Sequence, residues 1–143
     1  MRKPFMSLIV VLLLQACMLS HNGNTVTTNG NTVTTAEMNK LEIPLRRLGA
    51  AVQGLLWSAT PQDADLIAMA CKDDSSLCDA FSNYKLYTRV VDGNAVLLIC
   101  TSDGKRALVE DIACTPTPEK EFVDGNAPCE FTLPEQTIRE VCR

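Results

Sequence analysis

Histidine is almost absent from this sequence, because His21 is the only one in 143 residues. The Ser-His-Asp and Cys-His arrangements, which are the common ways of activating a serine or a cysteine, need a histidine held rigidly beside the nucleophile. His21 lies among Asn, Gly and Thr residues that have little apolar surface to bury, so a folded core does not position it. The sequence also lacks a glycine-rich phosphate loop, a zinc signature and a dinucleotide fingerprint. We therefore expect a non-enzymatic protein that uses neither a cofactor nor a metal.

Basic residues are fewer than acidic ones, with 13 Lys and Arg against 17 Asp and Glu and a net charge of −4. Loss of residues 1–16 as a leader would also remove Arg2 and Lys3, so the remaining chain would be more acidic still. An acidic surface is repelled by the phosphates of nucleic acids. We expect no nucleic-acid partner, whereas a basic protein partner is compatible with this charge.

The N-terminus has the three parts of a secretory signal peptide. Arg2 and Lys3 are basic, the apolar run Leu8–Leu14 is far too short to span a bilayer, and the small residue Ala16 follows it. The rest of the chain is long enough for one domain with a modest core. We predict that residues 1–16 are a leader and that residues 36–143 form a single exported domain.

The leader ends next to a cysteine, in the residues Leu14, Gln15, Ala16 and Cys17. This tetrapeptide resembles the lipobox of bacterial lipoproteins, in which signal peptidase II cuts before the cysteine and the thiol carries a diacylglycerol. The resemblance implies a lipid on Cys17. In a bacterium with two membranes it also implies an outer-membrane anchor, with the domain facing the periplasm or the cell surface, because Met18 is not the Asp that this family associates with inner-membrane retention. An ordinary signal peptide, cut after Ser20, is the alternative.

The segment between this cysteine and the domain contains a tandem repeat. The sequence Asn-Gly-Asn-Thr-Val-Thr-Thr occurs twice between Asn22 and Thr35, without any charge, and its only apolar side chains are Val26 and Val33. Such a segment gains little by becoming ordered, so we predict a flexible tether over residues 17–35. A hairpin is the alternative, because Thr and Val alternate in both copies.

Six further cysteines follow in the domain: Cys71, Cys78, Cys100, Cys114, Cys129 and Cys142. An even number in an exported chain indicates disulfides, because the compartment is oxidising. Each bridge would contribute about 2–4 kcal/mol. This matters in a chain that has only seven Phe, Tyr and Trp residues to fill its core. The spacing of the cysteines does not select the pairing.

Apolar residues at helical spacing predict a long first helix after Thr34, which stands three residues before Glu37 as in a capping box. Its apolar face would consist of Leu41, Leu45, Leu48, Val52 and Leu55. We expect Pro44 either to kink this helix or to mark its start. The amphipathic pattern fits a helix that packs on the chain's own domain. The functional alternative is a helix that binds a membrane surface or a partner.

Two shorter helices are expected next. One opens at Thr60 and Pro61, and the other covers Ser76–Asn83. The inner face of the first would consist of Ala64, Ile67, Ala68 and Cys71. A bridge between Cys71 and Cys78 requires a break between the helices, since the two residues would lie about 10 Å apart in a continuous helix.

Three β-rich runs predict an antiparallel meander: Tyr84–Val91, Ala95–Thr101 and Arg106–Cys114. With a first turn of residues 92–94, the face expected to receive the helices consists of Leu86, Thr88, Val90, Val96, Leu98, Cys100, Ala107 and Val109. Cys100 would then point into the core toward Cys71 or Cys78, and it would lie opposite Ala107 rather than Cys114. The predicted fold class is α+β, with N-terminal helices packed on this small meander and disulfides stabilising it.

The C-terminal part is expected to be irregular, because it contains four prolines. A second Val-Asp-Gly-Asn-Ala, at residues 123–127, predicts a short hairpin between residues 119–122 and 129–132. Thr132 and Glu135 have the spacing of a capping box and predict a last helix up to Cys142. The expected partner of Cys142 is Cys129 or Cys114.

Few side chains indicate a functional site. The candidate binding residues are Trp57, Tyr84 and Tyr87, and a cluster of the three would favour a module that binds a small ligand or the cell wall. Glu110 and Asp111 are adjacent carboxylates of the kind used in glycoside hydrolysis. Neighbours on a strand point to opposite faces, however, which does not suit a hydrolytic pair. We expect these two acids on a solvated surface.

These features together favour a lipid-anchored envelope protein that works by binding another envelope protein. Small proteins of this design serve as secretion or pilus assembly factors, as inhibitors or immunity proteins, or as exclusion factors, and no motif here selects one role. A small-ligand or cell-wall binding module is the alternative. A carboxylate-based hydrolase is the third class.

Overall fold

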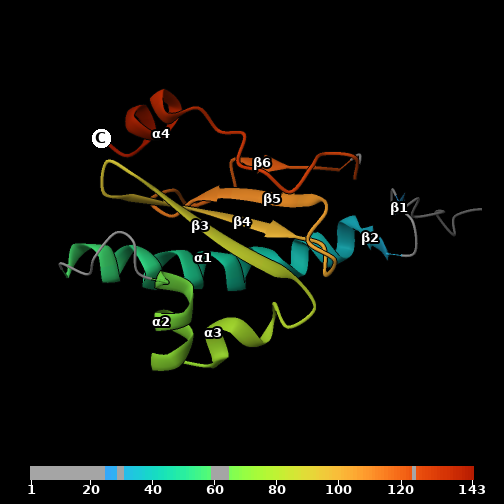
Figure 1. Ribbon diagram of the computed structural model, residues 1–143, viewed down its shortest axis with the longest axis horizontal. Helices are drawn as coiled ribbons and strands as arrows, with labels where there is room; N and C mark the ends of the chain where they lie inside the picture. The colour runs from blue at the N-terminus through green and yellow to red at the C-terminus, as the bar shows by residue number, and fades with distance from the viewer. Residues whose placement is uncertain (1–24, 29–30, 59–64, 124) are drawn as a thin grey trace, which may run out of the picture.

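The computed structural model describes residues 25–28, 31–58, 65–123 and 125–143, and these residues form helices and an antiparallel sheet (Figure 1). The predicted leader, the lipidation site Cys17 and the predicted helix start at Thr60 and Pro61 lie outside the described residues. The α+β class and the pairing of all six later cysteines are confirmed.

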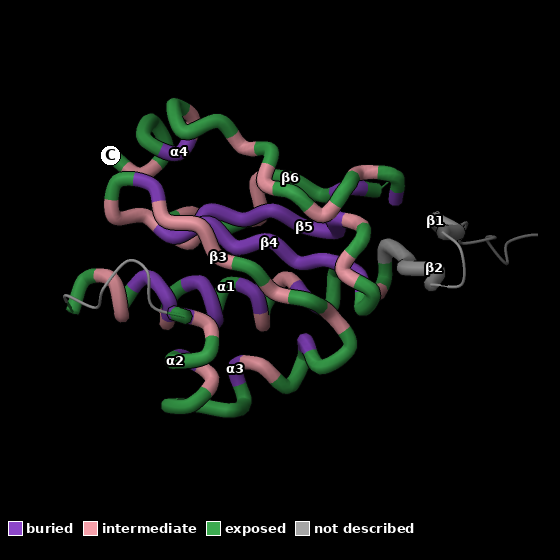
Figure 2. Tube along the Cα trace, in the orientation of Figure 1, coloured by how far each residue is buried: buried purple, intermediate pink, exposed green. Residues whose placement is uncertain are grey.

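A four-stranded antiparallel sheet forms the middle layer. Its strands, in order, are β3 (Lys85–Val91), β4 (Asn94–Cys100), β5 (Ala107–Ile112) and β6 (Lys120–Glu121). The first three form the predicted meander. One side of the sheet carries α1 (Thr35–Trp57), α2 (Leu66–Asp73) and α3 (Ser76–Asp79). The C-terminal segment and α4 (Glu135–Val141) cover the other side (Figure 1), so the central strands are buried along almost their whole length (Figure 2).

The turn between β3 and β4 decides which residues of the sheet face the helices. It contains only Asp92 and Gly93, both with positive φ, at 50° and 78°, and Val91 pairs with Asn94. The predicted register, which placed three residues in this turn, is therefore wrong by one position. Because side chains alternate along a strand, a shift of one residue exchanges its two faces.

Strand β4 consequently presents the opposite face from the predicted one. Leu97 and Ile99 pack against the helices, whereas Leu98 and Cys100 face the C-terminal segment. Cys100 does lie opposite Ala107, as expected. For this pair, the prediction was wrong only about the side of the sheet: Cys100 and Ala107 face the C-terminal segment and not the helices.

Helix α1 lies along the sheet with its apolar face inward. The residues that are at most 5% exposed include Leu41, Leu45, Leu48 and Val52, as their spacing predicts. Leu55 is partly buried against the same core. The helix runs through Pro44 instead of starting there. Gly49 is buried against the sheet, where a Cβ at this position would be in ordinary van der Waals contact, at 3.5 Å, with Ala113 and Leu97.

Helix α2 starts at an acidic cap. The Asp65 side chain accepts a hydrogen bond from the backbone N–H of Ala68 at 3.0 Å, which satisfies one free donor of the first turn. The helix buries Leu66 and Ala70, whereas Ala68, predicted to face inward, is exposed. The buried face is thus rotated from the predicted one.

The three disulfides pair Cys71 with Cys78, Cys100 with Cys129, and Cys114 with Cys142. The first joins α2 to α3 across the break that such a bridge was predicted to need, although α3 ends at Asp79 and not at Asn83. The third is one of the two pairings expected for Cys142. Cys100 does not point toward Cys71 or Cys78 as predicted, because it faces the C-terminal segment, where it pairs with Cys129.

The C-terminal segment does not form the predicted hairpin. Strand β6 pairs with β5, with Glu121 opposite Val109, and not with residues 129–132. This pairing covers an edge that β5 would otherwise leave open. Helix α4 begins at Glu135 after Pro134, while Thr132, the predicted cap, hydrogen bonds to Glu110 instead.

The repeat in the predicted tether contains a hairpin. Strands β1 (Thr25–Thr28) and β2 (Asn31–Thr34) are antiparallel, with Val26 opposite Val33. The structure thus gives these residues the alternative hairpin instead of the predicted flexible coil. Two identical β-prone copies can align in register, and the sequence Asn-Gly between them is typical of short hairpin connections.

Candidate functional site

The three aromatic residues predicted to bind do not cluster. Trp57 is the last residue of α1 and is 78% exposed. Tyr84 lies near the other end of α1, where burial and the charge of Glu37 raise the pKa of its hydroxyl. Trp57 follows Glu37 by 20 positions, which correspond to about 30 Å of helix. Tyr87 projects from the face of β3 that is turned away from the helices, and its hydroxyl lies beside Gly104 in the β4–β5 turn.

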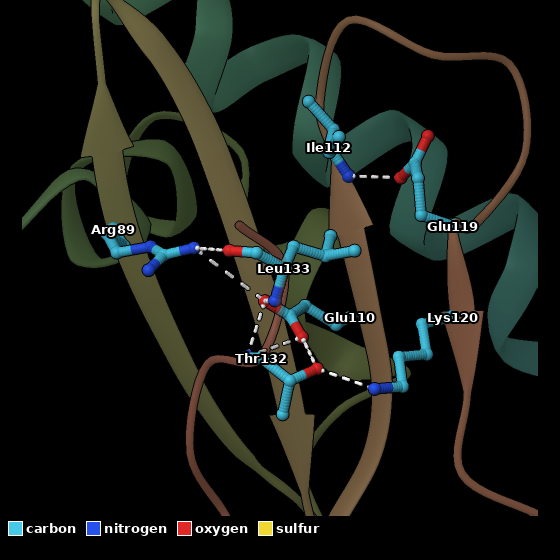
Figure 3. Close-up of polar contacts among 7 residues, drawn as sticks. All are labelled: Arg89, Glu110, Ile112, Glu119, Lys120, Thr132 and Leu133. Atoms are coloured by element: carbon cyan, nitrogen blue, oxygen red, sulfur yellow. Dashed lines mark hydrogen bonds and ion pairs between the residues drawn. The ribbon is translucent and has the colours of Figure 1, made fainter. Parts of the chain in front are cut away.

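Glu110 on β5 is fully buried and fastens the C-terminal segment to the sheet (Figure 3). Its carboxylate accepts hydrogen bonds from the backbone N–H groups of Thr132 and Leu133 at 2.9 and 3.0 Å, and from the Thr132 hydroxyl at 2.7 Å. Arg89 lies 3.9 Å from this carboxylate and donates to the Leu133 carbonyl at 2.8 Å. Charge-assisted hydrogen bonds of this kind compensate the cost of burying a carboxylate. Both carboxylate oxygens of Glu110 therefore accept hydrogen bonds that hold the C-terminal segment on the sheet.

Asp111, the next residue, points to the helix side of the sheet, where it lies opposite Leu97. It is 2% exposed, and its Oδ1 accepts no hydrogen bond from the described residues. Burial, followed by the nearby carboxylate of Glu119, raises the pKa of Asp111 to about 7, while Arg46 on α1 acts in the opposite direction. Glu119 itself accepts the backbone N–H of Ile112 at 2.6 Å (Figure 3).

The positions of the two acids confirm one expectation and correct another. Glu110 and Asp111 do point to opposite faces, but both are buried, whereas solvated positions were predicted. The cause is that β5 is covered on both sides and paired at both edges. Two acids on opposite faces do not provide facing carboxylates for glycoside hydrolysis.

The side of α1 turned away from the sheet is exposed and carries two large apolar side chains. Ile43 is 68% and Trp57 is 78% exposed. They are 14 residues apart, nearly four full turns, so they lie on the same side of the helix about 21 Å from each other. We call this surface the outer face of α1, and its exposed residues are Ala36, Asn39, Lys40, Ile43, Arg46, Arg47, Ala50, Gly54 and Trp57.

The charged side chains of this outer face are all basic. Lys40, Arg46 and Arg47 are the exposed charged residues within positions 36–57 of α1. Arg47 lies 3.9 Å from Asp74 at the end of α2 and donates to the Ser76 hydroxyl at 3.5 Å, which holds its guanidinium at the border with α3. The pKa of Asp74 is lowered by its hydrogen bonds to Ser76 and, to a smaller extent, by Arg47.

Among the described residues, no group of three or more His, Cys, Asp or Glu side chains is placed to hold a metal ion. None of the helices in the described ranges combines the length and apolar character needed to cross a membrane. The chain matches no protein family, no curated protein and no solved structure.

Proposed function

We propose that this chain is a lipid-anchored envelope protein that acts without catalysis, by binding another protein of the envelope. The outer face of α1 carries this proposal, because it exposes Trp57 and Ile43 beside arginine side chains. Trp and Arg are the residue types that contribute most binding energy in protein interfaces.

The proposed location rests on the N-terminal sequence. The signal-peptide pattern and the resemblance of residues 14–17 to a lipobox favour export and a lipid on Cys17. The anchor would precede the β1–β2 hairpin and α1 in the sequence, so the lipid would attach the domain to the membrane through its N-terminal side. Three disulfides are consistent with an oxidising compartment.

Photo-crosslinking in intact cells tests whether the protein has a protein partner. A photoreactive residue is placed in the full-length chain at one of three exposed positions: Asn39 on α1, Lys105 in the β4–β5 turn, or Val123 after β6. We expect one dominant protein to be crosslinked from at least one position and identified by mass spectrometry. Irradiation that yields no protein adduct from any of the three positions would contradict the proposed function.

A further inference from the structure

The outer face of α1 has a charge opposite to that of the chain as a whole. The sequence has a net charge of −4, yet the exposed charges within residues 36–57 are Lys40, Arg46 and Arg47. The acidic residues of this helix, Glu37 and Glu42, are partly buried at its sides. Two neighbouring acids attract the arginines, with Asp74 beside Arg47 and the buried Asp111 near Arg46. The surface presented outward by the helix remains basic.

The outer face of α1 has small residues in its C-terminal half, between two large apolar side chains. Ala50 and Gly54 lie between the exposed side chains of Ile43 and Trp57. A Cβ placed on Gly54 would meet no atom within 4 Å, so no described part of the chain covers this position. Small side chains at the centre of a helix face allow the backbone of a second segment to approach closely.

Building on the proposed function, we propose that the outer face of α1 binds an acidic segment of the partner protein. This segment lies across Ala50 and Gly54, between Ile43 and Trp57, and directs Asp or Glu side chains toward the cations of the face. Complementary charges guide such an encounter and set its orientation. The apolar side chains at the two ends supply the area that is removed from water.

Other occupants fit this face less well. A second copy of the chain would bring the same three cations against one another, which is unfavourable. Residues 17–24 of the chain itself contain no acidic side chain. An anionic lipid surface would attract the cations, but binding to a lipid surface scales with the apolar area that is inserted. Ala50 and Gly54 add little of that area, whereas they favour the close approach of a protein backbone.

The test uses the full-length chain with the photoreactive residue at Asn39 in intact cells, and the crosslinked peptide is sequenced. We expect a peptide from one envelope protein in which Asp and Glu outnumber Lys and Arg. Trp57→Ala and Gly54→Leu are each expected to lower the crosslink yield at least about tenfold, as for the central residues of an interface. Lys40→Glu is expected to lower it several-fold, because it reverses one charge of the face.

Two matched variants control for changes of charge and size elsewhere. Lys105→Glu reverses an exposed cation in the β4–β5 turn, and Ala68→Leu enlarges an exposed small residue of α2. Both are expected to leave the yield from Asn39 unchanged. Circular dichroism and the intact disulfides of each purified variant show that it is folded. A yield that falls equally in the control variants would overturn the assignment to this face.

The outcomes separate this inference from the proposed function. An adduct with lipid, with a second copy of the chain, or with a peptide that lacks an excess of acidic residues would overturn the inference, as would a yield that Lys40→Glu leaves unchanged. A partner crosslinked only from Lys105 or Val123 would keep the proposed function and reject the outer face of α1. The absence of any protein adduct from all three positions would reject both.

Discussion

Replacing Asp111 by Asn is expected to remove a pH dependence from the stability of the folded chain. Asp111 is 2% exposed, and burial together with the charge of Glu119 raises its pKa from 3.8 to about 7. A difference of this size corresponds to about 4 kcal/mol between the ionised and the protonated forms. In the unfolded chain the carboxyl group is in water, so ionisation carries this cost only in the folded state.

The direction of the effect follows from proton binding. Between about pH 4 and pH 7 the folded chain keeps a proton on Asp111 that the unfolded chain has released, so the free energy of unfolding decreases as the pH rises through this window. Asp74 and Asp103 behave in the opposite way, because hydrogen bonds to Ser76 and Thr101 lower their pKa values. Their stabilising contribution is lost only as the pH falls below 3.8, outside the Asp111 window.

Urea unfolding at pH 5 and pH 8, followed by circular dichroism, measures this effect. Between these two pH values the free energy of unfolding of the wild type is expected to fall by about 2–3 kcal/mol because of Asp111. Asp111→Asn should lose this decrease and be more stable than the wild type at pH 8. Glu119→Gln, which removes only the neighbouring charge, should reduce the decrease in part. An equal pH dependence in the wild type and in Asp111→Asn would refute the reasoning.

Other substitutions test other parts of the structure. Glu110→Gln puts an amide group against N–H donors and is expected to lower the free energy of unfolding by about 3 kcal/mol in urea; a loss below about 1 kcal/mol would show that the buried carboxylate is not important for the fold. Gly54→Ala should raise stability by up to about 1 kcal/mol, visible as a higher Tm, since its Cβ meets nothing. Replacing Cys114 and Cys142 by Ala opens a bridge between residues 28 apart and should cost about 3–4 kcal/mol, with faster amide exchange in α4. Cys17→Ser should release the chain from the membrane fraction and remove the mass of the lipid; membrane attachment with unchanged mass would reject the lipid anchor.

The elements that could be predicted from the sequence are those whose signals are local. The apolar spacing from Leu41 to Val52 predicts α1, and β-prone runs separated by Asp-Gly turns predict the meander β3–β5. Both signals depend on residues a few positions apart, so they are visible without tertiary contacts. The even number of cysteines likewise predicted the three bridges. The lipid on Cys17 stays a prediction, because it lies outside the described residues.

Only the tertiary structure decided the features that depend on residues far apart in the chain. One residue fewer in the β3–β4 turn exchanged the faces of β4 and joined Cys100 to Cys129. The burial of Glu110 and Asp111 depends on two covering layers that come from opposite ends of the domain. The net negative charge of the sequence also gave no indication that the outer face of α1 is basic. Packing turns one side of the helix toward the sheet and leaves Lys40 among the outward side chains, so the fold decides which charges the surface exposes.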